Sequence, residues 1–288
     1  MIFGVLAATV LALYVLSCIA VYVWADRLIF QPDREVYMTP ADCGVAFRDV
    51  FIPLQGSESL HGWFHQARDG APSVLFLHGT CGNMSENIAH FRRLSCLGVS
   101  VLMVDYRGYG ASSGLRPSER EMKEDAVAAW KFLHEVAPAS TSRFVFGRSL
   151  GASVALGALP KLDIVSGVIL ECPFTSILDV VRLNKLSYLF PFSFLIRTKF
   201  NTYQAAAHVT RPVLLIHGTK DSLIPSDMSK ALLAQLVNGK LVLVSGAGHD
   251  NVALIGAKDY LEEISDFMDI CTRSKPEASR ILHDVVDG

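Results

Sequence analysis

Short apolar runs alternate with helix-like segments along most of the chain, and this alternation limits the possible folds more than any other feature. Residues 73–77 and 99–104 are apolar almost throughout, which is typical of strands buried on both faces. A hairpin is predicted at 48–54 and 60–66, further strands at 143–146, 164–170, 212–216 and 240–244, and helices at 118–137, 150–159, 226–237 and 252–271. The alternation predicts an α/β fold with a mainly parallel sheet covered by helices on both faces.

The first residues form a separate apolar segment. Residues 2–24 contain no charged side chain, and as a helix they would extend about 34 Å, enough to cross a hydrocarbon core of ~30 Å. No Lys or Arg precedes the segment, and it exceeds the apolar core of a secretory signal, so a transmembrane anchor is favoured over a cleaved signal peptide. Arg27 and Arg34 follow it, which favours a single-pass protein with its large domain on the cytoplasmic side.

The remaining chain is long enough for one sizeable domain. We expect a linker at 25–44, one α/β domain at 45–272 and a polar C-terminal tail at 273–288. Residues 173–208 interrupt the alternation and are predicted to form a short helical cap or lid. The formal net charge is −2, so the chain does not have the excess of basic residues that is typical of a nucleic-acid-binding domain. Six scattered cysteines without a Cys-x-x-Cys pair argue against a structural zinc site. The oligomeric state stays open.

A Gly-x-Ser-x-Gly pattern occurs twice, and its surroundings distinguish the two copies. Around Ser149 an apolar strand runs into the motif and a helix runs out of it, as a nucleophile elbow requires. The copy around Ser112 lies in a loop and is soon followed by Pro117. Ser149 is therefore the candidate nucleophile, and Ser112 is expected to have no catalytic role.

A serine hydroxyl needs a general base, and the base needs a carboxylate to orient it. Asp221 and His249 each follow the end of a predicted strand. Because ligands bind at the carboxyl edge of parallel sheets, we expect both side chains to meet Ser149 at that edge. Glu171, at another strand end, and Asp227 are the alternative acids.

An acyl-transfer site also needs backbone donors for the oxyanion. One is expected from the residue after the nucleophile, Leu150, and one from the glycine-containing loop 78–83, where Thr80 is the favoured donor. Cys81 is the next candidate in that loop. As a nucleophile Cys81 would lack a base beside it in the sequence, so we interpret it as a loop residue that lines the substrate site.

The predicted cap is strongly apolar near its middle. Residues 186–196 are apolar except for two serines and are interrupted by Pro191, so they are too short to span a bilayer. They form either a cap packed on the core or a lid that dips into the membrane and admits acyl chains. The cap is locally basic, which would suit an anionic lipid surface. Besides Cys81, three apolar side chains are candidate substrate contacts: Phe174, Leu178 and Phe190.

Together these motifs resemble the α/β-hydrolase superfamily over about residues 45–272. The matching segments are 78–79 with 82–83, 105–114, 147–151, 172–176, 217–221 and 246–249. The chain is most similar to single-span, membrane-anchored serine hydrolases, which include monoacylglycerol and lysophospholipid lipases and protein depalmitoylases. The resemblance implies an α/β-hydrolase fold, in which the triad residues follow the chain order of Ser149, Asp221 and His249.

The expected chemistry is hydrolysis of a carboxylic ester. Ser149 would attack the carbonyl, His249 would take its proton and return it to the leaving alcohol, and Asp221 would orient the imidazole. The expected partners are an ester substrate with an acyl chain and the lipid bilayer, with no metal, cofactor or nucleic acid. The same family pattern occurs in serine peptidases, so a peptidase or amidase is the alternative, and a non-catalytic membrane scaffold is less favoured.

Overall fold

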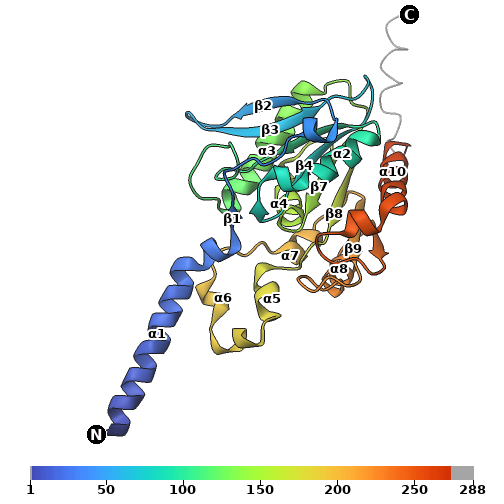
Figure 1. Ribbon diagram of the computed structural model, residues 1–288. Coiled ribbons are helices and arrows are strands. Elements are labelled where there is room, and N and C mark those ends of the chain that lie inside the picture. Colours follow the sequence, from blue (N-terminus) through green and yellow to red (C-terminus); the bar gives the residue numbers. More distant parts are fainter. Residues whose placement is uncertain (1, 274–288) are drawn as a thin grey trace, which may run out of the picture.

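A twisted sheet runs through the middle of the domain (Figure 1). The computed structural model describes residues 2–273, and within them this sheet has eight strands in the order β10-β9-β8-β7-β4-β6-β3-β2. The strands are β2 Arg48–Pro53, β3 Ser59–His65, β4 Ser73–Leu77, β6 Ser100–Val104, β7 Arg143–Arg148, β8 Gly167–Glu171, β9 Val213–Gly218 and β10 Gly239–Val244. β3 is antiparallel to β2 and β6, and the other neighbours are parallel. The predicted mainly parallel sheet is confirmed.

Helices connect the strands and extend the chain at both ends. They are α1 Ile2–Ile29, α2 Ile88–Cys96, α3 Glu119–Val136, α4 Leu150–Ala158, α5 Ile177–Arg182, α6 Phe192–Leu195, α7 Thr202–Ala206, α8 Asp227–Leu233, α9 Val252–Ile255 and α10 Ala257–Arg273. Two short strands, β1 Gln31–Pro32 and β5 Cys81–Gly82, pair in parallel outside the main sheet.

Alternate side chains of each central strand enter two different cores, because successive residues of a strand point to opposite faces. Leu75 and Leu77 of β4 pack into the core that α3 and α4 share with the sheet. Val74 and Phe76 pack on the other face, in the core formed with α2 and α10. All four side chains are fully buried. Helices therefore cover both faces of the sheet, as predicted.

Helix α3 begins where the sequence provides a cap. The Ser118 hydroxyl accepts a hydrogen bond from the Glu121 backbone N–H at 3.2 Å and donates to the Glu121 carboxylate at 2.6 Å. This pairing satisfies a backbone donor that a helix N-terminus leaves free. The buried side chains Met122, Ala126 and Trp130 then recur along one face of the helix, which fixes α3 against the sheet.

Several boundaries differ from the prediction. Helix α2 was not expected, although its buried residues Ile88, Phe91 and Leu94 recur at helical spacing. The helix predicted at 252–271 is two helices, because Ala257 has a φ of +44° and redirects the chain between α9 and α10. The strand predicted from residue 164 begins at Gly167, since Ile164 has a φ of +53°.

The chain ends also differ from the predicted division. Helix α1 continues to Ile29, so the first residues of the predicted linker are helical. Helix α10 includes Arg273, the first residue of the predicted tail, and the rest of that tail lies outside the described residues. By length and composition α1 could cross a membrane, with a mean hydropathy of 2.5, as a membrane anchor or a signal sequence could. The cap, containing α5 to α7, projects from the domain on the same side as α1 (Figure 1).

Candidate active site

Ser149 occupies a sharp turn between β7 and α4. Its φ of +53° and ψ of −115° lie in a region that residues with a side chain rarely adopt, and such strain is typical of functional sites. Two glycines allow the turn. A Cβ on Gly151 would lie 2.0 Å from the Leu77 carbonyl oxygen, and a Cβ on Gly147 would lie 2.4 Å from that of Gly151. The glycines of the motif therefore serve close backbone packing around Ser149.

The structure brings the three predicted residues together at the carboxyl edge of the sheet. Ser149 Oγ lies 3.1 Å from His249 Nε2, and His249 Nδ1 lies 2.7 Å from Asp221 Oδ2. A carboxylate can only accept a hydrogen bond, so Nδ1 carries the proton and Nε2 is left to accept from the serine hydroxyl. The imidazole is thus oriented to remove the Ser149 proton.

Asp221 is held by more partners than His249 alone. Its Oδ1 accepts from the backbone N–H groups of Leu223 and Ile224 at 2.9 and 2.8 Å, and His217 Nε2 lies 3.2 Å from Oδ2. Burial raises the pKa of Asp221, but His217, His249 and the Ile224 N–H outweigh burial and bring the pKa well below its usual range. Asp221 is therefore an anion at neutral pH. The supporting role of His217 is not among the roles predicted from the sequence.

The alternative acids have other partners. Glu171 is buried and bonds to His90 at 3.0 Å and to the Tyr260 hydroxyl at 2.6 Å. Asp227 lies at the start of α8 and pairs with Lys230 at 2.8 Å in an exposed position. Asp221 is thus the candidate acid that contacts the histidine.

Ser112, the second serine in a Gly-x-Ser-x-Gly pattern, joins two loops. Its Oγ donates to the Asp105 carbonyl at 2.7 Å and accepts from the His61 backbone N–H at 2.8 Å, and the side chain is buried. These bonds connect the loop after β6 to β3. The Ser112 hydroxyl is therefore engaged in joining these two segments.

Arg148, inside the elbow motif, links β7 to the loop that carries His249. Its guanidinium contacts Glu171 at 3.2 Å, Asp250 at 2.7 Å and the His249 carbonyl oxygen at 3.4 Å. Burial raises the pKa of Glu171, but His90, Arg148 and Tyr260 outweigh burial and lower the pKa to about 2, so Glu171 is ionised at neutral pH. The buried carboxylate therefore fixes Arg148, and Arg148 fixes the backbone that carries His249. Neither the role of Arg148 nor its pairing with Glu171 is among the features predicted from the sequence.

The loop after β4 lies directly beside Ser149, where an oxyanion donor is needed. A Cβ on Gly79 would lie 3.6 Å from the Ser149 Cβ. The carbonyl of Thr80 accepts from the Tyr109 hydroxyl at 2.8 Å and from the Gln31 N–H at 3.2 Å, and its Oγ1 donates to the Ile29 carbonyl. These bonds hold the carbonyl and the hydroxyl of Thr80 in place next to the elbow.

Leu150 is the first residue of α4, directly after Ser149. The N-terminus of a helix carries backbone N–H groups and a partial positive charge. The turn therefore places a helix N-terminus beside the serine, where negative charge develops during acyl transfer.

Cys81 is not activated as a nucleophile. Its Sγ lies 3.5 Å from the Gln31 side-chain oxygen. Partial burial raises the pKa of the Cys81 thiol, and Glu86 and Asp250 raise it further, so the reactive thiolate is disfavoured. Cys81 belongs to β5, which places it in the loop next to the elbow.

The other candidate substrate contacts lie in different surroundings. Phe174 is buried in the core on the α3–α4 side of the sheet, and Leu178 is partly exposed on α5. The Phe190 ring stacks on Tyr14 of α1, with 5.9 Å between ring centroids and 14° between planes. Phe190 therefore contacts the N-terminal helix.

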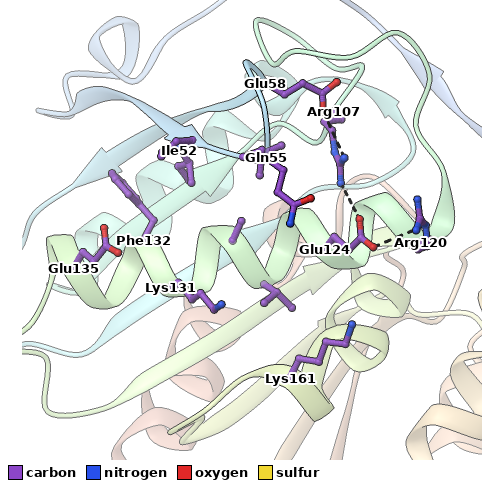
Figure 2. A pocket seen from close by; sticks show the side chains of 14 residues that line it. Ile52, Gln55, Glu58, Arg107, Arg120, Glu124, Lys131, Phe132, Glu135 and Lys161 are labelled. Atoms are coloured by element: carbon purple, nitrogen blue, oxygen red, sulfur yellow. Dashed lines mark hydrogen bonds and ion pairs between the residues drawn. The ribbon is translucent and has the colours of Figure 1, made fainter.

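A groove of about 860 Å³ lies away from this site, between the β2–β3 hairpin and α3 (Figure 2). Arg107 pairs there with Glu58 at 3.6 Å and with Glu124 at 3.3 Å, and Arg120 lies 3.8 Å from Glu124. None of the serine, histidine and aspartate of the candidate site is among the described residues that line it. The groove is therefore separate from the elbow.

Within residues 2–273, one group of side chains is close enough to share a metal ion. The ligand atoms of Cys172, His217 and Asp221 lie within 4.8 Å of one another. His217 Nε2 also lies 2.8 Å from the Ile224 carbonyl oxygen, so it carries a proton and offers no lone pair. Burial strongly raises the pKa of the Cys172 thiol. The group fits the support of the Asp221 carboxylate better than a metal site.

Family models and relatives agree on the class of protein. A family model described as serine aminopeptidase, S33, matches residues 70–195, and one described as TAP-like protein matches residues 196–275. An α/β hydrolase domain-containing protein, WAV2 of Arabidopsis thaliana, is 33% identical over 73% of this chain and 75% of its own length. The chain therefore belongs to the α/β-hydrolase superfamily, and it is a hydrolase of that fold.

Relatives and solved structures extend this similarity. An uncharacterized protein of Mycobacterium tuberculosis is 33% identical over 88% of this chain and 91% of its own length, and protein bem46 of Schizosaccharomyces pombe is 28% identical over 91% and 90%. The Pyrococcus furiosus esterase Pf2001 superposes with a TM-score of 0.71 at 23% identity, covering 84% of this chain and 98% of the esterase. The structural similarity confirms the α/β-hydrolase fold.

Proposed function

We propose that this protein is a membrane-anchored serine hydrolase that cleaves carboxylic esters carrying an acyl chain. The observation that supports the proposal most directly is the hydrogen-bonded series from Ser149 through His249 to an ionised Asp221, at 3.1 and 2.7 Å. These are the distances at which a general base can activate a nucleophile. Helix α1 would hold the domain at the membrane, as a single-pass anchor.

The mechanism follows from the positions of these groups. Ser149 Oγ attacks the ester carbonyl while His249 Nε2 takes its proton, and Asp221 stabilises the imidazolium that forms. The Leu150 and Thr80 N–H groups would stabilise the oxyanion. His249 then protonates the leaving alcohol, and water activated by the same imidazole cleaves the acyl-enzyme. The sequence of steps releases the acid and restores Ser149.

The serine aminopeptidase description of one family model favours a second candidate, an aminopeptidase. An aminopeptidase has to bind a substrate ammonium, for which a carboxylate near the cap is the natural partner. Asp179 in α5 already accepts from the Thr175 and Ser176 hydroxyls at 2.8 and 2.7 Å and pairs with Arg182 at 3.7 Å. Because Asp179 is engaged in capping its own helix, the ester substrate is favoured.

Labelling with a fluorophosphonate probe tests the proposed nucleophile. The full-length protein should be labelled, and the Ser149→Ala variant should lose labelling and at least about 10³-fold in ester hydrolysis. The Ser57→Ala variant, an exposed serine in the turn between β2 and β3, is the matched control and should keep both. An unlabelled full-length protein, or equal labelling of the Ser149→Ala variant, would contradict the proposal. A panel of ester and aminoacyl-amide substrates then separates the esterase from the aminopeptidase.

A further inference from the structure

The middle of the cap packs against the side of α1. Phe190, just after the 3-10 turn Lys185–Leu189, stacks on Tyr14. Tyr14 precedes Asp26 by twelve residues, so the stack lies about 18 Å along the helix axis from Asp26. In Figure 1 α6 lies next to α1, and the two also make contacts within the structure. The cap therefore reaches well along a helix that is long enough to cross a membrane.

The contacts between the cap and α1 change from polar to apolar with distance from the domain. Asp26 binds Arg197 at 3.1 Å and the Thr198 hydroxyl at 2.7 Å, and the Arg197 guanidinium lies 5.0 Å from the centre of the Tyr22 ring. Further along α1 the contact is the aromatic stack on Tyr14. A bilayer has the same order: polar and aromatic groups lie at its interface, and apolar groups lie in its core.

Large apolar side chains next to this stack face outward. Tyr188, Leu189 and Phe194 are 81%, 63% and 83% exposed, and residues 186–196 contain no charged side chain. Exposed apolar groups gathered on one short segment are costly in water and mark a surface that contacts a partner or a membrane. Their position beside α1 favours the membrane.

Six of the ten backbone N–H groups of residues 186–196 are paired with carbonyl groups of the cap. Hydrocarbon offers no hydrogen-bond partners, so the N–H groups have to be paired within the protein. Pairing within the cap satisfies the N–H groups of these residues: Ser187, Phe190, Phe192, Phe194, Leu195 and Ile196. Pro191 has no N–H to satisfy.

We infer that the cap tip, residues 186–196, is immersed in the hydrocarbon of the bilayer leaflet nearest the domain, beside α1. The inference rests on the proposed anchoring by α1. It deepens the proposed function, because the cap leaves the sheet next to the site: the Cys172 thiol lies 3.7 Å from the His249 carbonyl oxygen. A cap that joins the site to the leaflet favours substrates whose acyl chains arrive sideways from the membrane.

Quenching of tryptophan fluorescence by lipids with brominated acyl chains tests the immersion. The probe is Phe194→Trp in a Trp24→Phe background, with the full-length protein in phosphatidylcholine vesicles. The remaining tryptophans, Trp63 and Trp130, are buried and contribute a constant signal. The matched control is Phe51→Trp, 59% exposed on β2, a strand at the far side of the domain from α1 (Figure 1).

We expect brominated chains to quench the probe at least roughly twofold more than the control, since quenching requires contact with the acyl region. Tyr188→Trp is a second probe if the first variant does not fold. Equal quenching of probe and control, while wild-type Trp24 is quenched, overturns the inference and leaves the anchor in place. If brominated chains do not quench Trp24 in the wild-type protein, both the anchoring by α1 and the immersion of the cap tip are overturned. The measurement needs no substrate, so a failure of the proposed esterase activity is read separately.

Discussion

At the scale of single residues, the site depends on an aspartate that its partners keep ionised at neutral pH. Asp221 receives two backbone N–H groups and two imidazoles, and together they keep its pKa well below the usual range. An anion at this place sets the tautomer of His249, and the tautomer decides which nitrogen faces Ser149. The charge of the Asp221 carboxylate therefore controls whether His249 can accept the proton of Ser149.

This dependence leads to a prediction for Asp221→Asn. The amide keeps the shape of the carboxylate but removes the charge and permits the wrong tautomer of His249, so kcat for a soluble p-nitrophenyl ester should fall by about 10⁴-fold. The matched control is Asp227→Asn, an exposed acid at the start of α8, which should keep full turnover. If Asp221→Asn retained turnover within about tenfold of wild type, Asp221 would not be the orienting acid.

At the scale of elements, one buried carboxylate ties four parts of the fold together. Glu171 ends β8 and bonds to His90 of α2, Arg148 of β7 and Tyr260 of α10. Arg148 and Glu171 are directly paired positions on neighbouring parallel strands. The helices on that face of the sheet are thereby joined to the strand end that carries the nucleophile.

Replacing Glu171 by Gln should destabilise the protein in a pH-dependent way. Breaking a buried ionic group costs roughly 3 kcal/mol in free energy of unfolding at pH 7. The pKa of Glu171 is lowered from 4.5 to about 2 in the fold, so its stabilisation is present above pH 4.5 and is lost as the pH falls towards 2. The difference between wild type and variant should therefore shrink in acid.

Urea unfolding in detergent at pH 7, 5 and 3 measures this difference. The matched control is Glu135→Gln, an exposed position on α3, which should change the unfolding free energy by less than about 0.5 kcal/mol. A difference that stayed constant down to pH 3 would show that the Glu171 charge does not contribute.

The elements also show what could be predicted from the sequence. Ser149, Asp221 and His249 could be proposed because each lies in a local pattern of strand end, glycine and turn, and parallel strands bring their carboxyl ends to one edge. Arg148 and Glu171 could not be joined in advance, because their pairing depends on β7 and β8 being neighbours. That order is a property of the assembled sheet and leaves no local signal.

At the scale of the whole molecule, residues 29–35 form a strap between α1 and the active-site loops. Gln31 pairs with Cys81, and the Asp33 N–H donates to the Gly82 carbonyl at 2.9 Å. The strap lies within the linker predicted at 25–44. Its contacts with residues 80–82 join positions about 50 residues apart, so no local sequence pattern indicates them. Helix α1 and the loop after β4 are consequently one connected unit.

Arg34 is the side chain through which this strap can be tested. Its guanidinium donates to the carbonyl oxygens of Gly110, Ser112 and Gly114. Arg34→Ala should lower the free energy of unfolding by about 2 kcal/mol, because charged donors are lost from partly buried carbonyls. It should also lower kcat, since the strap holds the loop next to Ser149.

Urea unfolding and steady-state hydrolysis of a short ester measure these two effects. Arg27→Ala, an exposed arginine near the end of α1, is the matched control and should change neither. A less stable Arg34→Ala protein with unchanged kcat would limit the strap to a structural role.

The hydrogen bond from Thr80 to Ile29, the last residue of α1, has a consequence for how turnover is measured. A helix that spans a membrane, as proposed for α1, tilts when the thickness of the surrounding bilayer changes. The end of α1 is bonded to Thr80, the proposed oxyanion donor. Lipid chain length and detergent are then variables of the chemistry itself. Rates obtained in one micelle would not carry over to a membrane of another thickness.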